Sequence, residues 1–360
     1  MTFASDRLEH NQETLAKQRY DSQRNLHASR TSRFKFEPEQ VMQLLRQRIV
    51  GQAQALQEIE QVLQVVKADF CHPERPLAVV LMLGSTGVGK TETVRVISEA
   101  IHGRRDAFCR IDMNTLAQEH YSAALTGAPP GYVGSKEGTT LFDIEAIQGS
   151  FGKPGIVLFD ELEKASTEVI RSLLNVLEDG KLTLTSGVKT IDFRNCLIFM
   201  TSNVGAKALQ QHWGHWPRAL KYLLKSRDQF EQVLIDAALE QRFDPEFLNR
   251  IDRILHYQRV KADAIPALVQ IELNQLNQRL AKQGREISLD LSVIQHMRQH
   301  YDGRYGARQL ARQMRTQVEP VIAAYLLKYP ETDQLQVAYV QGLYQVLHAE
   351  KTTTSRLAIE

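Results

Sequence analysis

A glycine-rich segment at residues 84–91 carries residue types that suit phosphate chemistry. Its sequence, GSTGVGKT, fits the spacing G-x-x-x-x-G-K-[ST] at every fixed position and directly follows the apolar run 77–83. In such a strand–loop–helix context, backbone N–H groups curl around phosphates at a helix N-terminus, where the helix dipole favours anions. We therefore predict a nucleoside triphosphate site in which Lys90 reaches the β- and γ-phosphates and the Thr91 hydroxyl coordinates Mg²⁺. The expected binding residues are Gly84, Ser85, Thr86, Gly87, Val88, Gly89, Lys90 and Thr91.

Two adjacent carboxylates, Asp160 and Glu161, follow the apolar run 155–159. Ligands of open α/β sheets bind at the carboxyl ends of strands, so we expect both carboxylates beside the phosphate loop. Asp160 would hold Mg²⁺ through its hydration shell. Glu161 would be the general base that orients and deprotonates the attacking water.

A second apolar run, 196–200, also ends in polar residues, Thr-Ser-Asn, the last of which is Asn203. A neutral amide near the γ-phosphate can position water without adding charge. On its own, Thr-Ser-Asn is more typical of a turn or a helix N-cap. Because the phosphate loop and the Asp160–Glu161 pair occur in the same chain, we include Asn203 in the predicted nucleotide site.

The elements that must position these residues alternate between strand and helix patterns. Segments of helical length separate five strand candidates, which argues for a mostly parallel sheet covered on both faces. The strand candidates are 77–83, 107–111, 156–159, 196–201 and 253–257. We predict an α/β fold with a mostly parallel five-stranded sheet flanked by helices, followed by a smaller, mainly helical C-terminal domain that includes a short strand at 334–340.

Composition divides the chain into four parts. Residues 1–36 are polar and rich in Gln, Arg and Asn, so we expect a disordered segment or a lone helix, which could dock a partner. We expect a large nucleotide-binding domain over 37–257, a small domain over 258–345 and a flexible tail over 346–360.

The overall composition of the chain argues against nucleic acid and membranes as partners. The chain has 360 residues, 43% hydrophobic and 24% charged, with a net charge of +2, which gives no general attraction to nucleic acid or anionic membranes. No apolar run approaches the roughly 20 residues of a membrane helix. Three scattered cysteines fit a reducing compartment. We expect a cytoplasmic protein that binds neither a membrane nor nucleic acid.

The order of the motifs GSTGVGKT, IVLFDE, MTSN, FLNRID (247–252) and GAR (306–308) resembles the Clp-type AAA+ ATPases. The similarity is greatest to the second ATPase domain of the ClpB and ClpA unfoldases and runs from about residue 37 to about 345. The FLNRID and GAR strings are far more specific to that branch than the phosphate loop. The chain is expected to carry one ATPase domain, without a coiled-coil middle domain or a zinc-binding module.

This resemblance implies ATP and Mg²⁺ as cofactors and assigns roles by position. Asn203 would sense the γ-phosphate, and Arg250 would be the arginine finger that reaches into a neighbouring subunit's site. Arg308 would be a second sensor on the small domain. In the string RIVGQ, Ile49 and Val50 would form apolar walls around adenine. For each arginine the alternative is an ordinary surface ion pair.

The resemblance also implies that the glycine- and proline-rich loop 127–134 lines the axial pore of a hexamer. Tyr132 and Val133 would contact a threaded polypeptide through apolar area. The loop continues as Ser-Lys-Glu-Gly-Thr, where the family usually has a second Tyr and acidic residues. This difference predicts a weaker grip or an acidic client.

The segment 205–243 differs from unfoldases that feed a peptidase. It lacks a glycine between an aliphatic residue and Phe or Leu, so peptidase docking is doubtful. It contains Trp213 and Trp216, which could dock an adaptor or pack on the domain itself.

The resulting hypothesis is an ATP-driven motor that remodels or unfolds proteins by threading them through a hexameric ring. One alternative is an AAA+ motor that remodels a nucleoprotein complex, but that class would predict a basic pore loop or an appended helix-turn-helix. Another is a nucleotide-controlled assembly scaffold, against which Glu161, Asn203 and Arg250 argue.

Overall fold

The computed structural model describes residues 32–117, 141–183, 190–205, 227–303 and 305–347. These residues divide into two compact units, with the boundary in the chain after Gln258. The loop tip Thr86–Val88 groups with the C-terminal unit, whereas its flanking residues belong to the N-terminal unit. The predicted pore residues Tyr132 and Val133, the tryptophans Trp213 and Trp216, and most of segment 1–36 lie outside the described residues.

The N-terminal unit is built on a five-stranded parallel sheet with strand order β2-β3-β6-β1-β7. Its strands are β1 (Ala78–Leu83), β2 (Cys109–Asp112), β3 (Gly155–Asp160), β6 (Cys196–Ser202) and β7 (Arg253–His256). Every residue of β1, β3 and β6 is buried, as expected for central strands of a parallel sheet with both faces covered. The predicted sheet is therefore confirmed.

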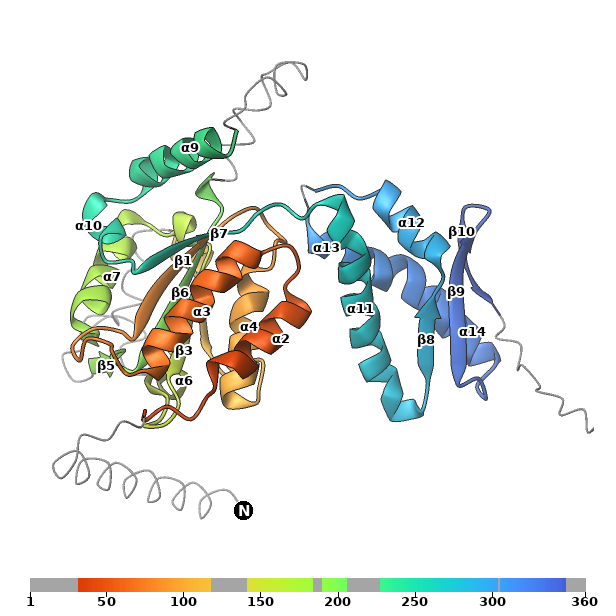
Figure 1. The fold of residues 1–360 in the computed structure, drawn as a ribbon, viewed down its shortest axis with the longest axis horizontal. Helices are drawn as coiled ribbons and strands as arrows, with labels where there is room; N and C mark the ends of the chain where they lie inside the picture. The colour runs from red at the N-terminus through yellow and green to blue at the C-terminus, as the bar shows by residue number, and fades with distance from the viewer. Residues whose placement is uncertain (1–31, 118–140, 184–189, 206–226, 304, 348–360) are drawn as a thin grey trace, which may run out of the picture. The chain divides into compact units, whose positions relative to one another are not determined.

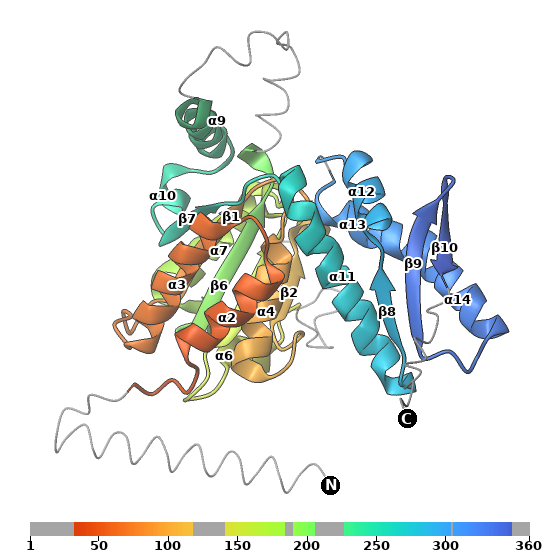
Figure 2. The ribbon, with the colours of Figure 1, turned by 45° about the vertical axis from the view of Figure 1, so that its right-hand side comes forward.

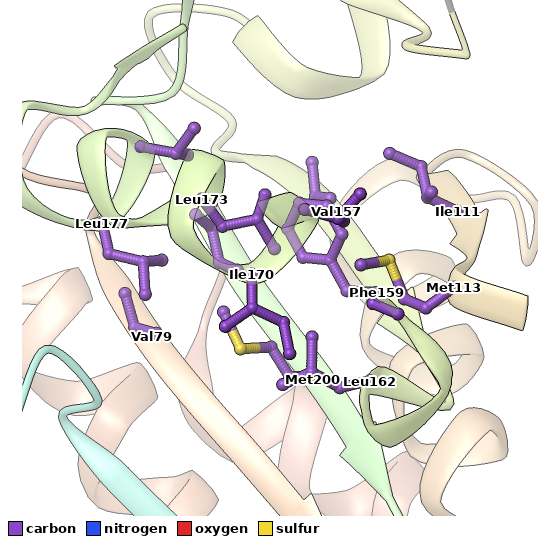
Figure 3. Packing of buried hydrophobic residues seen from close by; sticks show 14 of the residues in the cluster. Val79, Ile111, Met113, Val157, Phe159, Leu162, Ile170, Leu173, Leu177 and Met200 are labelled. Carbon is purple, nitrogen blue, oxygen red and sulfur yellow. The ribbon is translucent and has the colours of Figure 1, made fainter. Parts of the chain in front are cut away.

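Helices cover both faces of this sheet (Figures 1 and 2). On one face lie α2, α3 and α4, of which α4 contacts β3 and β6 and α3 contacts β7. On the other face, the apolar stripe of α7 packs against alternate strand residues such as Val79, Phe159 and Met200 (Figure 3). The helices of this unit are α2 (Pro38–Arg48), α3 (Ala53–Lys67), α4 (Lys90–His102), α6 (Ile144–Gln148), α7 (Thr167–Asp179), α9 (Arg227–Arg242) and α10 (Pro245–Leu248).

Two local features of this unit were not expected. A short antiparallel hairpin, β4 (Lys181–Thr183) with β5 (Thr190–Asp192), follows α7. Phe34 and Phe36, which belong to the polar segment 1–36, are buried, and Lys67 Nζ donates to both of their carbonyl oxygens at 2.8 Å. The ordered unit therefore includes the last residues before α2.

The C-terminal unit combines helices with a three-stranded sheet of order β10-β9-β8. Strand β9 (Gln334–Val340) has the bounds that the sequence predicted, whereas β8 (Glu286–Leu289) and β10 (Leu343–Leu347) were not predicted. The helices are α11 (Ile265–Leu280), α12 (Leu291–Gln299), α13 (Ala307–Gln313) and α14 (Glu319–Lys328). Among the described residues of both units, no helix combines the length and apolar character needed to cross a bilayer.

Candidate nucleotide site

The sheet brings the three predicted strand ends to one edge. Strands β1, β6 and β3 are neighbours, with Leu83 level with Ser202 and Phe159 level with Met200. Gly84 N–H donates to Ser202 O at 3.2 Å, which fixes the start of the phosphate loop against the end of β6. The loop, Asn203 and the Asp160–Glu161 pair therefore share the edge where ligands of parallel sheets bind.

Lys90 lies beneath the phosphate loop as the first residue of α4 and is only 7% exposed. Its Nζ donates to Gly84 O at 2.5 Å, to Ser85 O at 2.9 Å and to Asn203 Oδ1 at 3.0 Å. The preceding Gly89 has φ 107°, a backbone conformation that is unfavourable for residues other than glycine. This geometry links the loop, its helix and the end of β6 through one ammonium group.

Asp160 is 7% exposed, and both of its carboxylate oxygens have partners. Thr201 Oγ1 donates to Oδ1 at 2.5 Å, and Arg110 Nη2 and Nε donate to Oδ2 at 2.6 Å and 3.1 Å. Arg110 comes from the neighbouring strand β2 and was not predicted. The carboxylate thus already attracts a cation at the predicted Mg²⁺ position.

Glu161 has an unusual backbone for a residue with a side chain, φ 59° and ψ 50°. Its N–H donates to Thr201 Oγ1 at 2.9 Å, so one threonine fixes both Asp160 and Glu161. Left-handed backbone at a non-glycine residue costs on the order of 1–3 kcal/mol and concentrates at functional sites. The turn directs the chain away from β3 immediately after Asp160.

Asn203 connects Lys90 to a further carboxylate that the sequence analysis missed. Its Nδ2 donates to Glu163 Oε1 at 3.3 Å while its Oδ1 accepts from Lys90, so the amide has one orientation. Within the described residues, Glu163 Oε2 is buried without a hydrogen-bond partner. Arg242, at the end of α9, fixes the same turn by donating to Glu163 O at 3.1 Å and to Ala165 O at 2.6 Å.

The two arginines assigned by resemblance belong to different units, Arg250 to the N-terminal unit and Arg308 to the C-terminal unit. Arg250 follows α10, and its Nη2 pairs with Glu178 Oε1 of α7 at 2.8 Å. Its carbonyl oxygen accepts from Arg75 Nη2 at 3.1 Å. Arg308 is an exposed residue of α13 and belongs to the C-terminal unit.

The predicted adenine segment joins α2 to α3. Ile49 is buried, and a Cβ placed on Gly89 would lie 3.7 Å from its side chain, so Ile49 borders the end of the phosphate loop. Val50 is half-buried. The neighbouring Arg48 pairs with Glu99 of α4, and this pair holds the pKa of the Glu99 carboxyl below its usual value.

The residues present suit a triphosphate. Gly84, Gly87 and Gly89 all have positive φ, which lets the loop backbone adopt turns that expose its N–H groups. Ser85 Oγ is buried and lacks a hydrogen-bond partner within the described part of the chain. The loop N–H groups, the Ser85 hydroxyl and the buried ammonium of Lys90 are hydrogen-bond donors, and the oxygens of a polyphosphate would accept from them.

A parallel sheet with this loop and these strand ends defines a P-loop ATPase of the AAA class. Residues 75–254 match the family described as "AAA domain (Cdc48 subfamily)", and residues 260–337 match "C-terminal, D2-small domain, of ClpB protein". The chain belongs to the Clp-type AAA+ ATPases, related to the ClpB and ClpC proteins. It is an ATP-binding ATPase, as the resemblance implied.

Relatives of two kinds match the chain. It is 51% identical over 255 residues to the ATP-dependent protease ATP-binding subunit-like protein AmiB of Pseudomonas aeruginosa, covering 70% of this chain and 69% of that protein. A Rhodococcus erythropolis protein described as an ATP-dependent protease ATP-binding subunit-like protein is 40% identical over 260 residues, covering 72% and 74%. The ClpB chaperone of Gloeobacter violaceus is 39% identical over 249 residues, covering 69% of this chain and 27% of ClpB.

Solved structures of Hsp104 match at the level of the fold and the sequence. The closed state of Hsp104 with ATPγS and FITC casein superposes with a TM-score of 0.72 at 29% identity, covering 86% of this chain and 52% of that one. The extended Saccharomyces cerevisiae Hsp104:casein complex gives 0.73 at 27% identity, covering 88% and 54%. The chain thus spans about half the length of these Hsp104 chains.

Proposed function

We propose that this chain is an ATP-driven protein-remodelling motor that assembles as a homo-hexamer and threads a polypeptide through an axial pore. The observation that carries the proposal is the convergence of Lys90, Glu161 and Asn203 at one sheet edge of a Clp-type fold. An assembly scaffold would need nucleotide binding but no general base or water-orienting amide. Relatives described as chaperones or protease ATP-binding subunits support the remodelling role.

Each residue of the edge has a place in hydrolysis. Lys90 would contact the β- and γ-phosphates, while Asn203 would orient the attacking water and Glu161 would accept its proton. Thr91 and Asp160 offer the hard oxygen ligands that Mg²⁺ prefers, Asp160 acting through bound water, and the ion would neutralise charge on the phosphates. Ile49 and Val50 would hold the adenine, and Arg308 would approach the nucleotide from the C-terminal unit.

Arg250 provides the test of assembly. Its side chain is 32% exposed, with Nε buried and Nη2 paired with Glu178 of its own chain, so part of the guanidinium reaches the surface where a neighbouring subunit could meet it. We expect Arg250→Ala to bind ATP but to lose roughly 10³-fold or more in hydrolysis, the range of arginine fingers in triphosphatases. Mixed assemblies of Arg250→Ala and Lys90→Ala subunits should regain part of the rate, measured by phosphate release. Wild-type hydrolysis by Arg250→Ala alone would exclude the role in trans.

Tyr132 provides the test of threading. Both Hsp104 structures are complexes with casein, which supports a polypeptide client for this chain. Tyr132→Ala would remove an aromatic contact worth roughly 1.5–3 kcal/mol per subunit by burial. We expect unfolding of a tagged fluorescent protein, per ATP hydrolysed, to fall at least about tenfold.

Two comparisons give this experiment its controls. Ser135→Tyr, which restores an aromatic residue where the family usually has one, should raise the yield of unfolding per ATP. Equal yields from wild type and Tyr132→Ala would favour the scaffold. ATP hydrolysis stimulated by DNA would favour a motor for nucleoprotein complexes.

Residues 1–36 and the segment 205–243 bear on two further partners, an adaptor and a peptidase. We infer that residues 1–36, or the segment with Trp213 and Trp216, could recruit an adaptor. Deleting residues 1–31 leaves the buried Phe34 and Phe36 in place, so client capture can be compared without removing part of the ordered unit. Peptidase docking stays doubtful, since the segment 205–243 lacks the glycine-centred loop.

A further inference from the structure

A buried chain of hydroxyl groups lies under the phosphate loop and has no part in the roles above. Tyr257 is 5% exposed and Thr93 is fully buried. The Tyr257 hydroxyl donates to Thr93 Oγ1 at 2.9 Å, and Thr93 Oγ1 donates in turn to Gly89 O at 3.0 Å. Gly89 is the last glycine of the loop and directly precedes Lys90. The series of hydrogen-bonded hydroxyl groups therefore ends where the loop becomes α4.

The backbone of the same tyrosine fixes the other end of the loop. Tyr257 N–H donates to Leu83 O at 2.7 Å. A Cβ placed on Gly84 would lie 2.6 Å from Tyr257 O and 2.9 Å from Tyr257 Cβ. Such distances are too short for any side chain, so the loop can begin here only with glycine. Tyr257 therefore touches the first glycine and reaches the last one through Thr93.

The position of Tyr257 is itself fixed by the residue that follows it. Gln52 Nε2 donates to Gln258 O at 2.9 Å, and Gln258 N–H donates to Gln52 Oε1 at 2.8 Å. Gln52 is 3% exposed and ends the RIVGQ string that includes Ile49 and Val50. The segment expected to hold adenine and the support of the phosphate loop are thus joined by two hydrogen bonds.

We propose that Tyr257 is a positioning residue for nucleotide binding, whose hydroxyl holds Gly89, and with it Lys90 and the start of α4, in the phosphate-binding geometry. The inference rests on ATP binding at this site and is independent of threading. Burial raises the pKa of Tyr257, so the hydroxyl remains a donor throughout the working pH range. Loss of the hydroxyl leaves Thr93 without its donor and lets the end of the loop move.

Tyr257→Phe in the full chain tests the proposal, because it removes one oxygen and keeps the ring that packs beside the loop. A hydrogen bond of about 0.5–1.5 kcal/mol corresponds to a roughly two- to tenfold change. We expect the Kd for a fluorescent ADP analogue and the KM for ATP to rise about three- to tenfold, with kcat changed less than about twofold. Thr93→Val should raise both constants at least as much, and the double variant should add little to Thr93→Val.

Ser98→Ala is the matched control, since Ser98 is a fully buried hydroxyl of the same helix α4. Its Oγ donates to Arg104 O at 2.8 Å, at the far end of the helix from the loop. Ser98→Ala and Tyr257→Phe should lower Tm by similar amounts, but only Tyr257→Phe should weaken nucleotide binding. Wild-type Kd and KM for Tyr257→Phe, with Tm lowered as in Ser98→Ala, would overturn the proposal. Wild-type protein that binds nucleotide normally but unfolds no polypeptide would instead count against the proposed motor function.

Discussion

Lys90→Ala is expected to reduce nucleotide affinity by roughly 30- to 4,000-fold, because truncating one partner of a buried charge pair costs roughly 2–5 kcal/mol. Lys90 is 7% exposed, and its ammonium donates to Gly84 O and Ser85 O of the loop. Alanine leaves the helix in place and removes the positive charge that the phosphates would meet. Titration with a fluorescent ADP analogue and calorimetry with ATPγS measure the loss.

The matched control is Lys153→Ala, which removes one positive charge from an exposed position on the loop before β3. This variant should keep its affinity within about twofold, because exposed charges contribute little at a distance. A Lys90→Ala protein that binds as tightly as Lys153→Ala would remove Lys90 from the phosphate site. A circular dichroism melt would establish that both variants are folded.

Glu161→Gln is expected to retain ATP and to lose hydrolysis by roughly 10²–10⁴-fold, the usual contribution of a general base. The amide has nearly the shape of the carboxylate but cannot accept the proton of the attacking water. The backbone hydrogen bond from residue 161 to Thr201 Oγ1 does not involve the side chain, so the strained turn should persist. Phosphate release under single-turnover conditions, beside a nucleotide-affinity measurement, separates the two effects.

Glu163→Gln is the comparison that identifies the base. Glu163 lies two residues further along and accepts from Asn203 Nδ2, so its carboxylate positions the amide that would orient the water. We expect Glu163→Gln to lower the rate by less than about tenfold, because the amide oxygen of glutamine can still accept from Asn203 Nδ2 in a neutral hydrogen bond. If both variants lost hydrolysis equally, the assignment of the base to Glu161 alone would be wrong. An ATP-retaining Glu161→Gln assembly would also hold client proteins for identification.

The sequence predicted β1, β3 and β6 from continuous apolar runs, and β2 and β7 from shorter runs of mixed polarity, all separated by segments of helical length. Strand β9 was found from a short stretch rich in apolar residues, whereas β8 and β10 were missed. Strand β8 is four residues long, and in β10 exposed and half-buried residues alternate, including exposed Leu343. Neither pattern stands out from a loop or a helix end without its pairing partner.

In the candidate site, sequence motifs identified the residues that lie close together in the sequence. They missed the residues that distant elements bring to the site when the chain folds. The phosphate loop, Asp160 and Glu161 belong to short motifs of consecutive residues, so the sequence alone indicates their chemistry. Arg110 reaches Asp160 from another strand, and Arg242 reaches Glu163 O across 79 positions of the chain. The charged Arg110 among apolar neighbours of β2 was a usable signal, but nothing local distinguishes Arg242 from other helix-end arginines.

The amide of Gln52 has a mechanical consequence for the chain beyond the sheet. Its two hydrogen bonds to Gln258 reproduce the pair that a neighbouring strand would make, so they restrain the backbone torsions of Gln258 as a β-ladder does. Arg259 directly follows this restraint and is the first residue of the C-terminal unit after the boundary. We expect a domain movement driven by the nucleotide to pivot there, because hinges are a few loop or element-terminal residues that absorb φ/ψ changes.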